Sequence, residues 1–469
     1  MSSDRYDYAV VGGGIAGLAT AEILARSGRS VVLIERDKQL CLQASASQHG
    51  WFHFGSLYSI FPQNQFLRTM VGGVEDLLHY YTAFQGMNID VTKEGRLAFP
   101  QHDGAWFRDE AIEYIVCARN DPDFDMRSFD GIRDYAKKLF FLLTWETAIK
   151  QFISRHQRFH KHNWAGEVPA SQWIPRAGWT DYSREVITKP DDSNINLDRD
   201  THFRIVGYDR PMRASAIITD LVRSLVGSGG EIMTSTEVER IEQAGGMRRL
   251  ITKDDRDIGA GKVIVAAGKW LGHFLQRSQD VKVVASPLLV AYPAVASRNF
   301  VRMTPFVEKS VNHLHHVVDG HAYSLIGGGY FADPNDATAV DRAAEKLKEM
   351  ARNVFPGLDR TEMLESYLGY KTEIVAQSGE RNYQYLVREV DDGVFAVVPG
   401  KFSLAFSLAV NMFKRLTGEV PAVDLKLKAA AEIKPYIGLT KHAALVKTFN
   451  KKKTATQEME GVPDLVIHH

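Results

Sequence analysis

Residues 8–35 read YAVVGGGIAGLATAEILARSGRSVVLIE, in which a glycine-rich turn lies between two apolar runs. Residues 8–11 have the composition of a short buried strand, and the residues after the turn repeat their apolar side chains at helical spacing. Residues 30–34 predict a second strand, which ends at the acidic Glu35. This order of strand, glycine turn, helix, strand and acid is typical of a unit that binds the pyrophosphate of a dinucleotide.

The three glycines of the turn have separate roles in such a unit. Gly12 permits the tight turn, Gly14 lets a pyrophosphate approach the backbone, and Gly17 lets the helix pack closely on the strand. The helix N-terminus offers free N–H groups and a positive dipole end to the phosphates. Glu35 lies 18 residues beyond Gly17, placed to accept hydrogen bonds from ribose hydroxyls. The neighbouring residues that we also expect at the dinucleotide are Ile15, Ala16 and Arg36.

The composition is that of an ordinary globular protein, large enough for two or three hydrophobic cores. The chain has 469 residues, of which 45% are hydrophobic and 24% charged. Lys and Arg together number 57, as do Asp and Glu, so the zero net charge argues against a nucleic-acid partner. We expect no signal peptide and no membrane span, because the N-terminus is polar and no apolar run is long enough to span a membrane. We expect no disulfide framework, because only two cysteines occur. A cytoplasmic location is therefore expected.

A second segment, residues 44–55, follows the predicted second strand closely. Small hydroxyl side chains there can donate hydrogen bonds to phosphate, and its glycines let the backbone pass close to a flat ring. The alternative is a polar surface loop, which would rarely place Trp51 and Phe52 between two glycines. The residues of this segment that we expect at the cofactor are Ser45, Ser47 and Gln48.

Further signals lie downstream, because the glycine motif alone does not separate FAD from NAD. Residues 217–225 carry a helical apolar stripe, residues 231–233 predict a strand, and residues 262–270 read as a buried strand that ends in small residues. A backbone with small side chains can touch a ligand there.

These blocks together resemble the D-amino-acid oxidase and glycine oxidase superfamily of FAD enzymes, and residues 50–55 are most similar to the corresponding turn of L-2-hydroxyglutarate dehydrogenase-like members. The resemblance implies FAD as the cofactor. It places Val238 at the adenine through its backbone. It puts Ala267, Gly268 and Trp270 on the flavin side, and Gly400, Lys401, Phe402 and Ser403 at the pyrimidine ring.

The physics of the last block agrees with that placement. Ser403 opens an apolar helical run, so a helix N-terminus would face the ring. A positive dipole end stabilises the anion that reduced flavin develops, and Lys401 would add a full charge there.

The resemblance implies an α/β fold, with a Rossmann-like FAD-binding domain interleaved with an α+β substrate domain whose sheet is mostly antiparallel. The predicted FAD-binding domain takes residues 1–80, 207–280 and 365–430. The substrate or cap domain takes 81–206 and 281–364, with strands at 281–292 and 322–327 and a helix at 341–354 whose inward residues are Ala344, Leu347, Ala351 and Val354. Residues 431–469 form a C-terminal tail that we expect to be loosely ordered. Residues 98–200 are longer than the family pattern, and are expected to cap the site or form a contact between subunits of a homo-oligomer.

Two side chains are candidates for the catalytic chemistry besides Lys401. His53 lies in the turn expected near the flavin, where it would act as a base toward a substrate O–H or N–H, or attach the flavin covalently; a histidine that only bonds the backbone is the alternative. Lys371 falls where many relatives carry an arginine that binds a substrate carboxylate. Lysine lacks the planar fork of arginine, which puts an amino-acid substrate in doubt, and a solvated lysine is the alternative.

Other histidines carry weaker signals. His313, His315 and His316 lie on an expected strand, but no cysteine or acid accompanies them at zinc-ligand spacing, so we expect no metal. The cluster from His156 to His162 is expected to be a solvated face.

The sequence thus predicts an FAD-dependent oxidase or dehydrogenase that moves a hydride from a small-molecule C–H next to N or O to flavin N5. An amine, an amino acid or a 2-hydroxy acid is the expected substrate class. Two alternatives stay open: a flavin monooxygenase that uses NAD(P)H, and a flavin-binding protein without turnover. The first would need a Gly-Asp segment near the second half of the FAD site, which we do not find.

Overall fold

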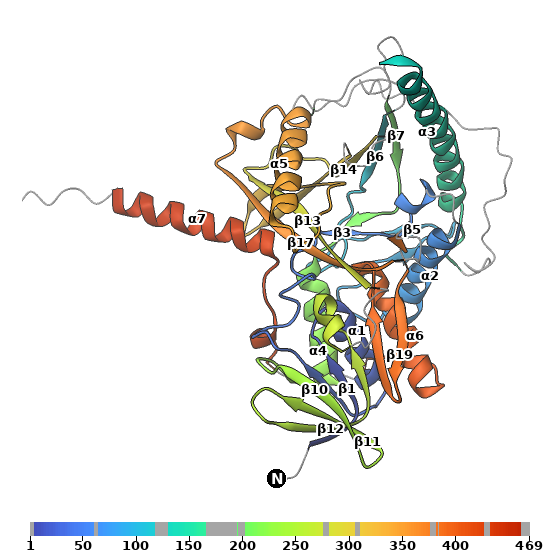
Figure 1. Ribbon diagram of the computed structural model, residues 1–469, viewed down its shortest axis with the longest axis vertical. Helices are drawn as coiled ribbons and strands as arrows, with labels where there is room; N and C mark the ends of the chain where they lie inside the picture. Colours follow the sequence, from blue (N-terminus) through green and yellow to red (C-terminus); the bar gives the residue numbers. More distant parts are fainter. Residues whose placement is uncertain are drawn as a thin grey trace, which may run out of the picture.

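The computed structural model describes residues 4–60, 64–117, 130–165, 195, 202–274, 281–304, 310–375, 381–382, 384–425 and 432–460. Two sheets of eight strands each lie one above the other, and each is built from stretches that alternate along the chain (Figure 1). This confirms the predicted fold class. The predicted domain boundaries stay a prediction; strand β17 (Met363–Val375) runs past residue 365 without a break and pairs in the second sheet.

The first sheet has a parallel centre. Its order is β10-β11-β12-β1-β2-β9, and β12 also pairs with β20, which pairs with β19. Strand β1 pairs in parallel with β2 on one side and β12 on the other, and β20 is parallel to β12. The strands are β1 (Asp4–Val11), β2 (Val31–Ile34), β9 (Glu231–Met233), β10 (Val238–Ala244), β11 (Met247–Thr252), β12 (Asp257–Val265), β19 (Leu386–Asp391) and β20 (Val394–Val398).

Successive side chains of these strands point to opposite faces of the sheet, so neighbouring residues pack against different layers. Val10 and Leu33 pack against a layer of helices, whereas Ala9 and Val32 face the opposite side, beneath the β10–β11 hairpin. The helices are α1 (Ile15–Arg26), α2 (Asn64–Tyr80), α4 (Ala214–Gly227) and α6 (Ala405–Thr417), the last preceded by the 3-10 turn η7 (Phe402–Leu404). Helix α1 is buried along its whole length because α4 and α6 enclose it.

The second sheet is antiparallel except for one pair. Its order is β18-β17-β13-β16-β15-β14-β6-β7, and only β14 and β6 run parallel. The remaining strands are β6 (Glu113–Cys117), β7 (His202–Val206), β13 (Val281–Tyr292), β14 (Phe300–Met303), β15 (Val311–Val318), β16 (His321–Gly328) and β18 (Arg381–Asn382). Two short pairs lie outside the sheets, β3 (Trp51–Phe52) with β8 (Arg210–Pro211) and β4 (Asp90–Val91) with β5 (Leu97–Ala98).

Helices cover both faces of this second sheet. Ala285 and Leu289 of β13 pack on α5 (Ala337–Val354), while Leu288 and Val290 pack on the other face with Val446 of α7 (Lys441–Glu460). The C-terminal half of α3 (Gly131–His160) packs on β6 and β14.

Three expectations are corrected. Helix α5 begins earlier than predicted, at Ala337, because the Asp336 side chain caps it by accepting the Ala339 N–H; Ala343 is buried where Ala344 was expected. His156 and His162 are buried rather than solvated.

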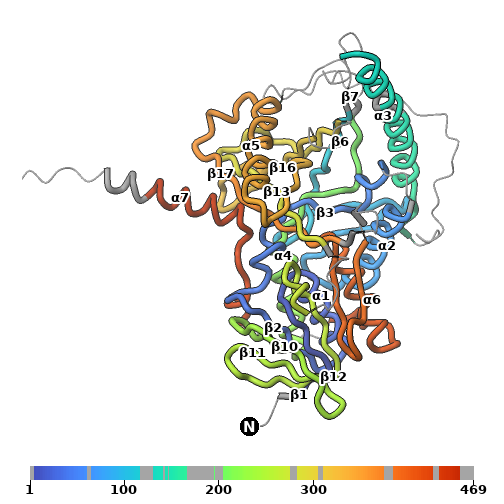
Figure 2. Tube along the Cα trace, viewed as in Figure 1, coloured from blue at the N-terminus to red at the C-terminus, as the bar shows by residue number. Residues whose placement is uncertain are grey.

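The third correction concerns the tail. Residues 441–460 are helical, and the segment before them bonds to the loop after β2: the Leu40 N–H donates to the Tyr436 carbonyl, and the Lys441 N–H to that of Ala46. The chain then rises to α7, which projects from the body (Figure 2). Within the described residues, no helix is long and apolar enough to cross a membrane.

Candidate functional site

A cavity of about 680 Å³ opens where the parallel strands of the first sheet end. The carboxyl ends of β1, β2, β12 and β20 all reach it, and β17 and residues of β13 close it from the second sheet. Ligands of open α/β sheets bind at this edge, because the strand ends leave a crevice there.

The glycine turn has the geometry that a close-approaching phosphate needs. Gly12 has a φ of +106°, and a Cβ there would lie 2.5 Å from the Ala266 carbonyl oxygen. A Cβ on Gly17 would lie 1.9 Å from the Gly12 oxygen, so helix α1 can sit on the turn only because that residue is glycine. Beside Gly14, by contrast, only the Ser45 hydroxyl lies near, at 3.6 Å, so the backbone is open toward the cavity.

Glu35 turns its carboxylate toward the same turn. Its Oε2 accepts the Gly13 N–H at 2.6 Å and its Oε1 accepts the Asp37 N–H at 2.9 Å. Burial raises the pKa of Glu35, and these two backbone bonds oppose the shift. The next residue, Arg36, stacks its guanidinium 3.3 Å from the centre of the Trp270 ring.

Nearly all residues predicted for the cofactor line this one cavity. The two exceptions are Gly17, which lies behind the turn, and Ser403, which is buried in η7. Those lining it are Gly12, Gly14, Ile15, Ala16, Glu35, Arg36, Ser45, Ser47, Gln48, Val238, Ala267, Gly268, Trp270, Gly400, Lys401 and Phe402. Thus segments that are up to nearly 400 residues apart in the sequence line the same cavity.

The three predicted catalytic residues also line the cavity and lie close enough to interact. His53, Lys371 and Lys401 gather at one end together with His49, which the sequence analysis did not single out. Burial lowers the pKa of His53; Asp209 opposes the shift, whereas Lys401 and Lys371 add to it. Burial also lowers the pKa of His49, and Lys371, His53 and Lys401 push it further down. Both imidazoles are therefore neutral at pH 7.

The cavity fits FAD. An open glycine backbone at a helix N-terminus suits a pyrophosphate, and a partly buried carboxylate at the second strand suits a ribose. The buried Ser403 hydroxyl and the buried Nδ1 of His49 have no hydrogen-bond partner among the described residues.

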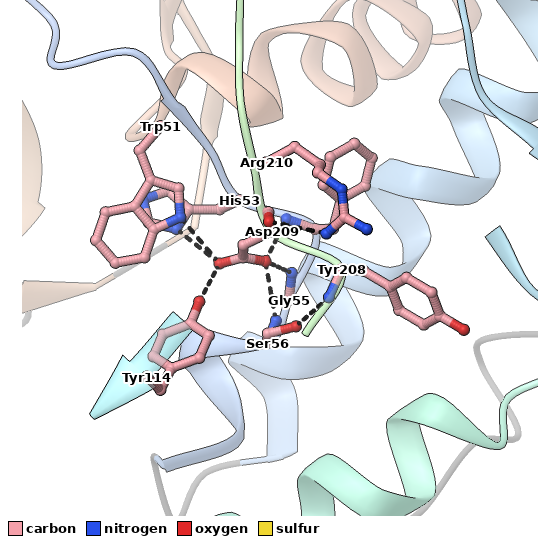
Figure 3. A network of polar contacts seen from close by, with 9 residues as sticks. Trp51, His53, Gly55, Ser56, Tyr114, Tyr208, Asp209 and Arg210 are labelled. Atoms are coloured by element: carbon pink, nitrogen blue, oxygen red, sulfur yellow. Dashed lines mark hydrogen bonds and ion pairs between the residues drawn. The ribbon is translucent and has the colours of Figure 1, made fainter. Parts of the chain in front are cut away.

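One residue at this site gave no signal in the sequence. Asp209 lies in the loop between β7 and β8, fully buried. Its carboxylate accepts hydrogen bonds from the Trp51 indole and the Tyr114 hydroxyl, and from the backbone of the turn that follows His53 (Figure 3). The sequence could not reveal this cluster, because Asp209 is more than 150 residues from Phe54, Gly55 and Ser56.

A family model described as FAD dependent oxidoreductase matches residues 7–184 and 207–398. The chain belongs to this FAD dependent oxidoreductase family. It is an FAD-dependent oxidoreductase.

Several solved structures share the fold of this chain at low sequence identity. L-α-Glycerophosphate oxidase from Mycoplasma pneumoniae, solved with FAD bound, matches with a TM-score of 0.61 at 15% identity, covering 92% of this chain and 100% of that one. Glycine oxidase from Geobacillus kaustophilus matches with a TM-score of 0.54 at 16% identity, over 92% and 100%. A curated relative, the mitochondrial L-2-hydroxyglutarate dehydrogenase of Nematostella vectensis, is 35% identical over 103 residues, which is 22% of each chain.

The histidines of β15 have structural partners. Both ring nitrogens of His313 are engaged, Nδ1 with the Arg298 carbonyl at 2.6 Å and Nε2 with the Ser324 hydroxyl at 2.7 Å. His316 packs over the His442 ring and lies 3.3 Å from the His49 carbonyl. In the described ranges, His, Cys, Asp and Glu form no group of three that could hold a metal ion.

Proposed function

We propose that this enzyme oxidises a small 2-hydroxy acid to the 2-oxo acid. The proposal rests on the charge at the end of the cavity where His53, Lys371 and Lys401 lie, which we call the catalytic end. Lys371 and Lys401 lie there with two neutral histidines, and among the described residues that line this end none is acidic. An anion is therefore the favoured ligand.

The same charge favours a hydroxyl over an amino group on the substrate. A 2-amino acid carries an ammonium at pH 7, which two lysines would repel and to which none of the described residues lining this end offers a carboxylate. A neutral hydroxyl meets no such penalty and can donate its hydrogen bond to an imidazole. The similarity of 103 residues to an L-2-hydroxyglutarate dehydrogenase supports this choice.

We propose the cofactor contacts that the family resemblance implies, and the placement of all of them but Gly17 and Ser403 along one cavity supports them. Gly12, Gly14, Ile15, Ala16 and Gly17 are proposed for the pyrophosphate end of FAD, with Ser45, Ser47 and Gln48 beside it. Glu35 and Arg36 are proposed for the ribose, Val238 for the adenine, Ala267, Gly268 and Trp270 for the flavin side, and Gly400, Lys401, Phe402 and Ser403 for the pyrimidine ring.

The chain's own residues have three tasks in this reaction. Bound FAD supplies the acceptor for the hydride that leaves the substrate carbon. Lys371 holds the substrate carboxylate, as a point charge without the fork of an arginine. The Nδ1 atom of His53 faces Asp209, which leaves Nε2 to accept the hydroxyl proton.

The test is anaerobic reduction of the purified yellow holoenzyme, followed as bleaching of the flavin absorbance. A series from lactate to 2-hydroxyglutarate is compared with the matching 2-amino acids and with the neutral 2-hydroxy amides. We expect bleaching by hydroxy acids, and none by the amides. Reduction by amino acids alone would contradict the substrate class, and reduction by NADPH alone would favour a monooxygenase.

Lys371→Met isolates the carboxylate contact. It should raise the concentration of hydroxy acid needed for half-maximal reduction by about tenfold or more, since a charge-assisted bond is lost. Lys414→Met, an exposed lysine on α6, is the matched control and should leave that concentration unchanged.

A further inference from the structure

The carboxylate of Asp209 is surrounded by hydrogen-bond donors. Oδ1 accepts the backbone N–H groups of Phe54, Gly55 and Ser56 at 2.8, 3.1 and 3.1 Å. Oδ2 accepts the Trp51 indole N–H at 3.1 Å and the Tyr114 hydroxyl at 2.6 Å. A neutral carboxylic acid could not satisfy this many donors, so the group is ionised although it is buried.

The pKa values of this cluster agree with an ionised Asp209. Burial alone would raise the pKa of Asp209, but the His53 imidazole, 3.4 Å away, the Tyr114 hydroxyl and the Phe54 backbone N–H outweigh it and hold the pKa below its usual value. Burial and the Asp209 charge keep the pKa of Tyr114 well above its usual value, so Tyr114 stays a donor.

His53 is fixed against this carboxylate. Its Nδ1 lies 3.4 Å from Oδ2 of Asp209. The ring packs between Trp51, at 4.5 Å between centroids, and Tyr58, at 5.4 Å. Both neighbours in the sequence of His53 are also buried aromatics, so the imidazole has little freedom to turn.

We propose that Asp209 is the positioning residue that holds His53 in the Nδ1–H tautomer, with the Nε2 lone pair directed to the substrate. This inference rests on the proposed function, in which His53 is the base. It adds Asp209 to the reaction, a residue that does not line the cavity and that lies far from His53 in the sequence.

The proton and electron balance follows directly. The substrate hydroxyl would give its proton to Nε2 of His53, and bound FAD would supply the acceptor for the hydride of the substrate carbon, so that a 2-oxo acid is the product. His53 then carries a positive charge, which the Asp209 carboxylate stabilises while it stays ionised itself.

The other charged and titratable groups that face His53 are His49, Lys371 and Lys401. The two lysines oppose protonation of His53, and Asp209 favours it. Tyr58 and Tyr114 contact the pair as neutral phenols. The acidic limb of the rate of flavin reduction therefore reports on His53, whose protonation Asp209 favours and the two lysines oppose.

The decisive variant is Asp209→Asn, studied in the FAD-loaded enzyme with ¹⁵N-labelled histidine. An amide that keeps its oxygen toward the backbone of the 54–56 turn must present its NH₂ group to His53. The amide then donates to Nδ1 and moves the imidazole proton to Nε2. We expect ¹⁵N NMR to show the Nδ1–H tautomer in the wild-type enzyme and Nε2–H in the variant, with flavin reduction by 2-hydroxyglutarate or lactate slowed by roughly a thousandfold or more.

Asp220→Asn is the matched control. Asp220 is another buried aspartate that accepts an indole N–H, from Trp106, and a backbone N–H, from Gly86, both at 2.8 Å. Its substitution disturbs the fold in a similar way but lies outside the cavity, so the His53 tautomer should not change. A His53 tautomer that is the same in Asp209→Asn and wild type would overturn the proposal.

Tyr114→Phe keeps the test open if the Asn variant does not fold. Removing one donor leaves more of the Asp209 charge for His53, so the acidic limb of the reduction rate should move to higher pH. A limb that stays in place or moves down contradicts the pairing. His53→Gln separates this inference from the proposed function: wild-type reduction in that variant refutes His53 as the base, whereas the NMR result still decides the role of Asp209.

Discussion

Glu35 holds its partly buried carboxylate beside the glycine turn, at the edge of the cavity. Its oxygens each accept one backbone N–H, from Gly13 and Asp37, which fixes the carboxylate at the end of β2. Two acceptor lone pairs remain for ribose hydroxyls. Glu35→Ala should therefore weaken FAD binding by roughly ten- to a hundredfold, since a hydrogen bond to a charged group contributes about 1.5–3 kcal/mol.

Equilibrium titration of the apo-protein with FAD, followed by flavin fluorescence, measures this change. Glu242→Ala on β10, an acid that lies outside the cavity and pairs with Arg240, is the control and should bind FAD as the wild type does. Full FAD affinity in Glu35→Ala would remove this residue from the cofactor site.

Lys401 stands at the entrance of the turn that leads into α6. It is the N-cap residue of η7, and its side chain lines the cavity. If it lies at the pyrimidine ring, its charge stabilises the anion that reduction creates. Lys401→Met should then lower the reduction potential of bound FAD by roughly 20 mV for each 1 kcal/mol of lost interaction, and FAD occupancy should stay intact. Lys414→Met on the exposed face of α6 is the control; an unchanged potential in Lys401→Met would show that its charge does not act on the ring.

The residues that the sequence could reveal are those whose role is local. Gly12 and Gly17 lie within one turn, and their packing against each other follows from the spacing alone. Asp209 and His49 are different. Asp209 reaches the His53 turn only because β8 pairs with β3, and His49 is partly buried, with His316 of β15 beside it and residues of β17 lining the same cavity. Contacts between residues so far apart along the chain leave no periodic pattern in the sequence.

At the scale of elements, the helices with a clear apolar face were predictable, and α7 was not. The stripe on α4 is buried as its spacing indicates. Residues 441–460 lack such a stripe and carry three consecutive lysines, so the sequence predicted a loose tail. The helix is held instead by a few contacts near its start: Val446 is fully buried among Leu288, Leu325 and Met363.

Because α7 has so few anchors, a single substitution should release it. Val446→Ala removes two buried methyl groups and should cost about 1–3 kcal/mol, enough to open a helix docked by so small a contact. Hydrogen exchange of residues 441–454 should accelerate by one to two orders of magnitude, roughly the factor that this energy implies. Val420→Ala, at an exposed valine, should change nothing. Exchange in wild-type α7 as fast as in an unfolded peptide would contradict the docking itself.

At the scale of the whole molecule, the notable feature is how many histidines are buried in both layers. Those whose burial lowers the pKa are His49, His53, His156, His160, His313, His315, His316 and His442. The pKa lies well below its usual value for His49 and His316, and it is about 3 for His156 and His442 and about 4 for His313. The plan of two domains, one of them with a mostly antiparallel sheet, was implied by the family resemblance, but this burial was not, since histidine is intermediate between the residue types that are usually buried and those that are usually exposed.

These histidines set how the stability of the enzyme depends on pH. The unfolded chain binds a proton at each of them near pH 6.5, whereas the folded chain does not until the pH reaches the lowered value. Their contribution to stability is therefore complete above about pH 6.5 and is lost as the pH falls from there toward 4, by up to about 1.4 kcal/mol per pH unit for each histidine.

Urea denaturation of the holoenzyme, with FAD in fixed excess, should show a free energy of unfolding that is flat from pH 7 to 8 and falls steeply from pH 6 to 5. His442→Gln, which removes one such group where it accepts the Tyr323 hydroxyl, should reduce that slope by about one proton, whatever it costs in absolute stability. His102→Gln, at an exposed histidine, should leave the slope unchanged. A slope that is the same in all three proteins would mean that His442 is protonated equally in the folded and unfolded chains, and that the burial of its ring does not exclude the charge.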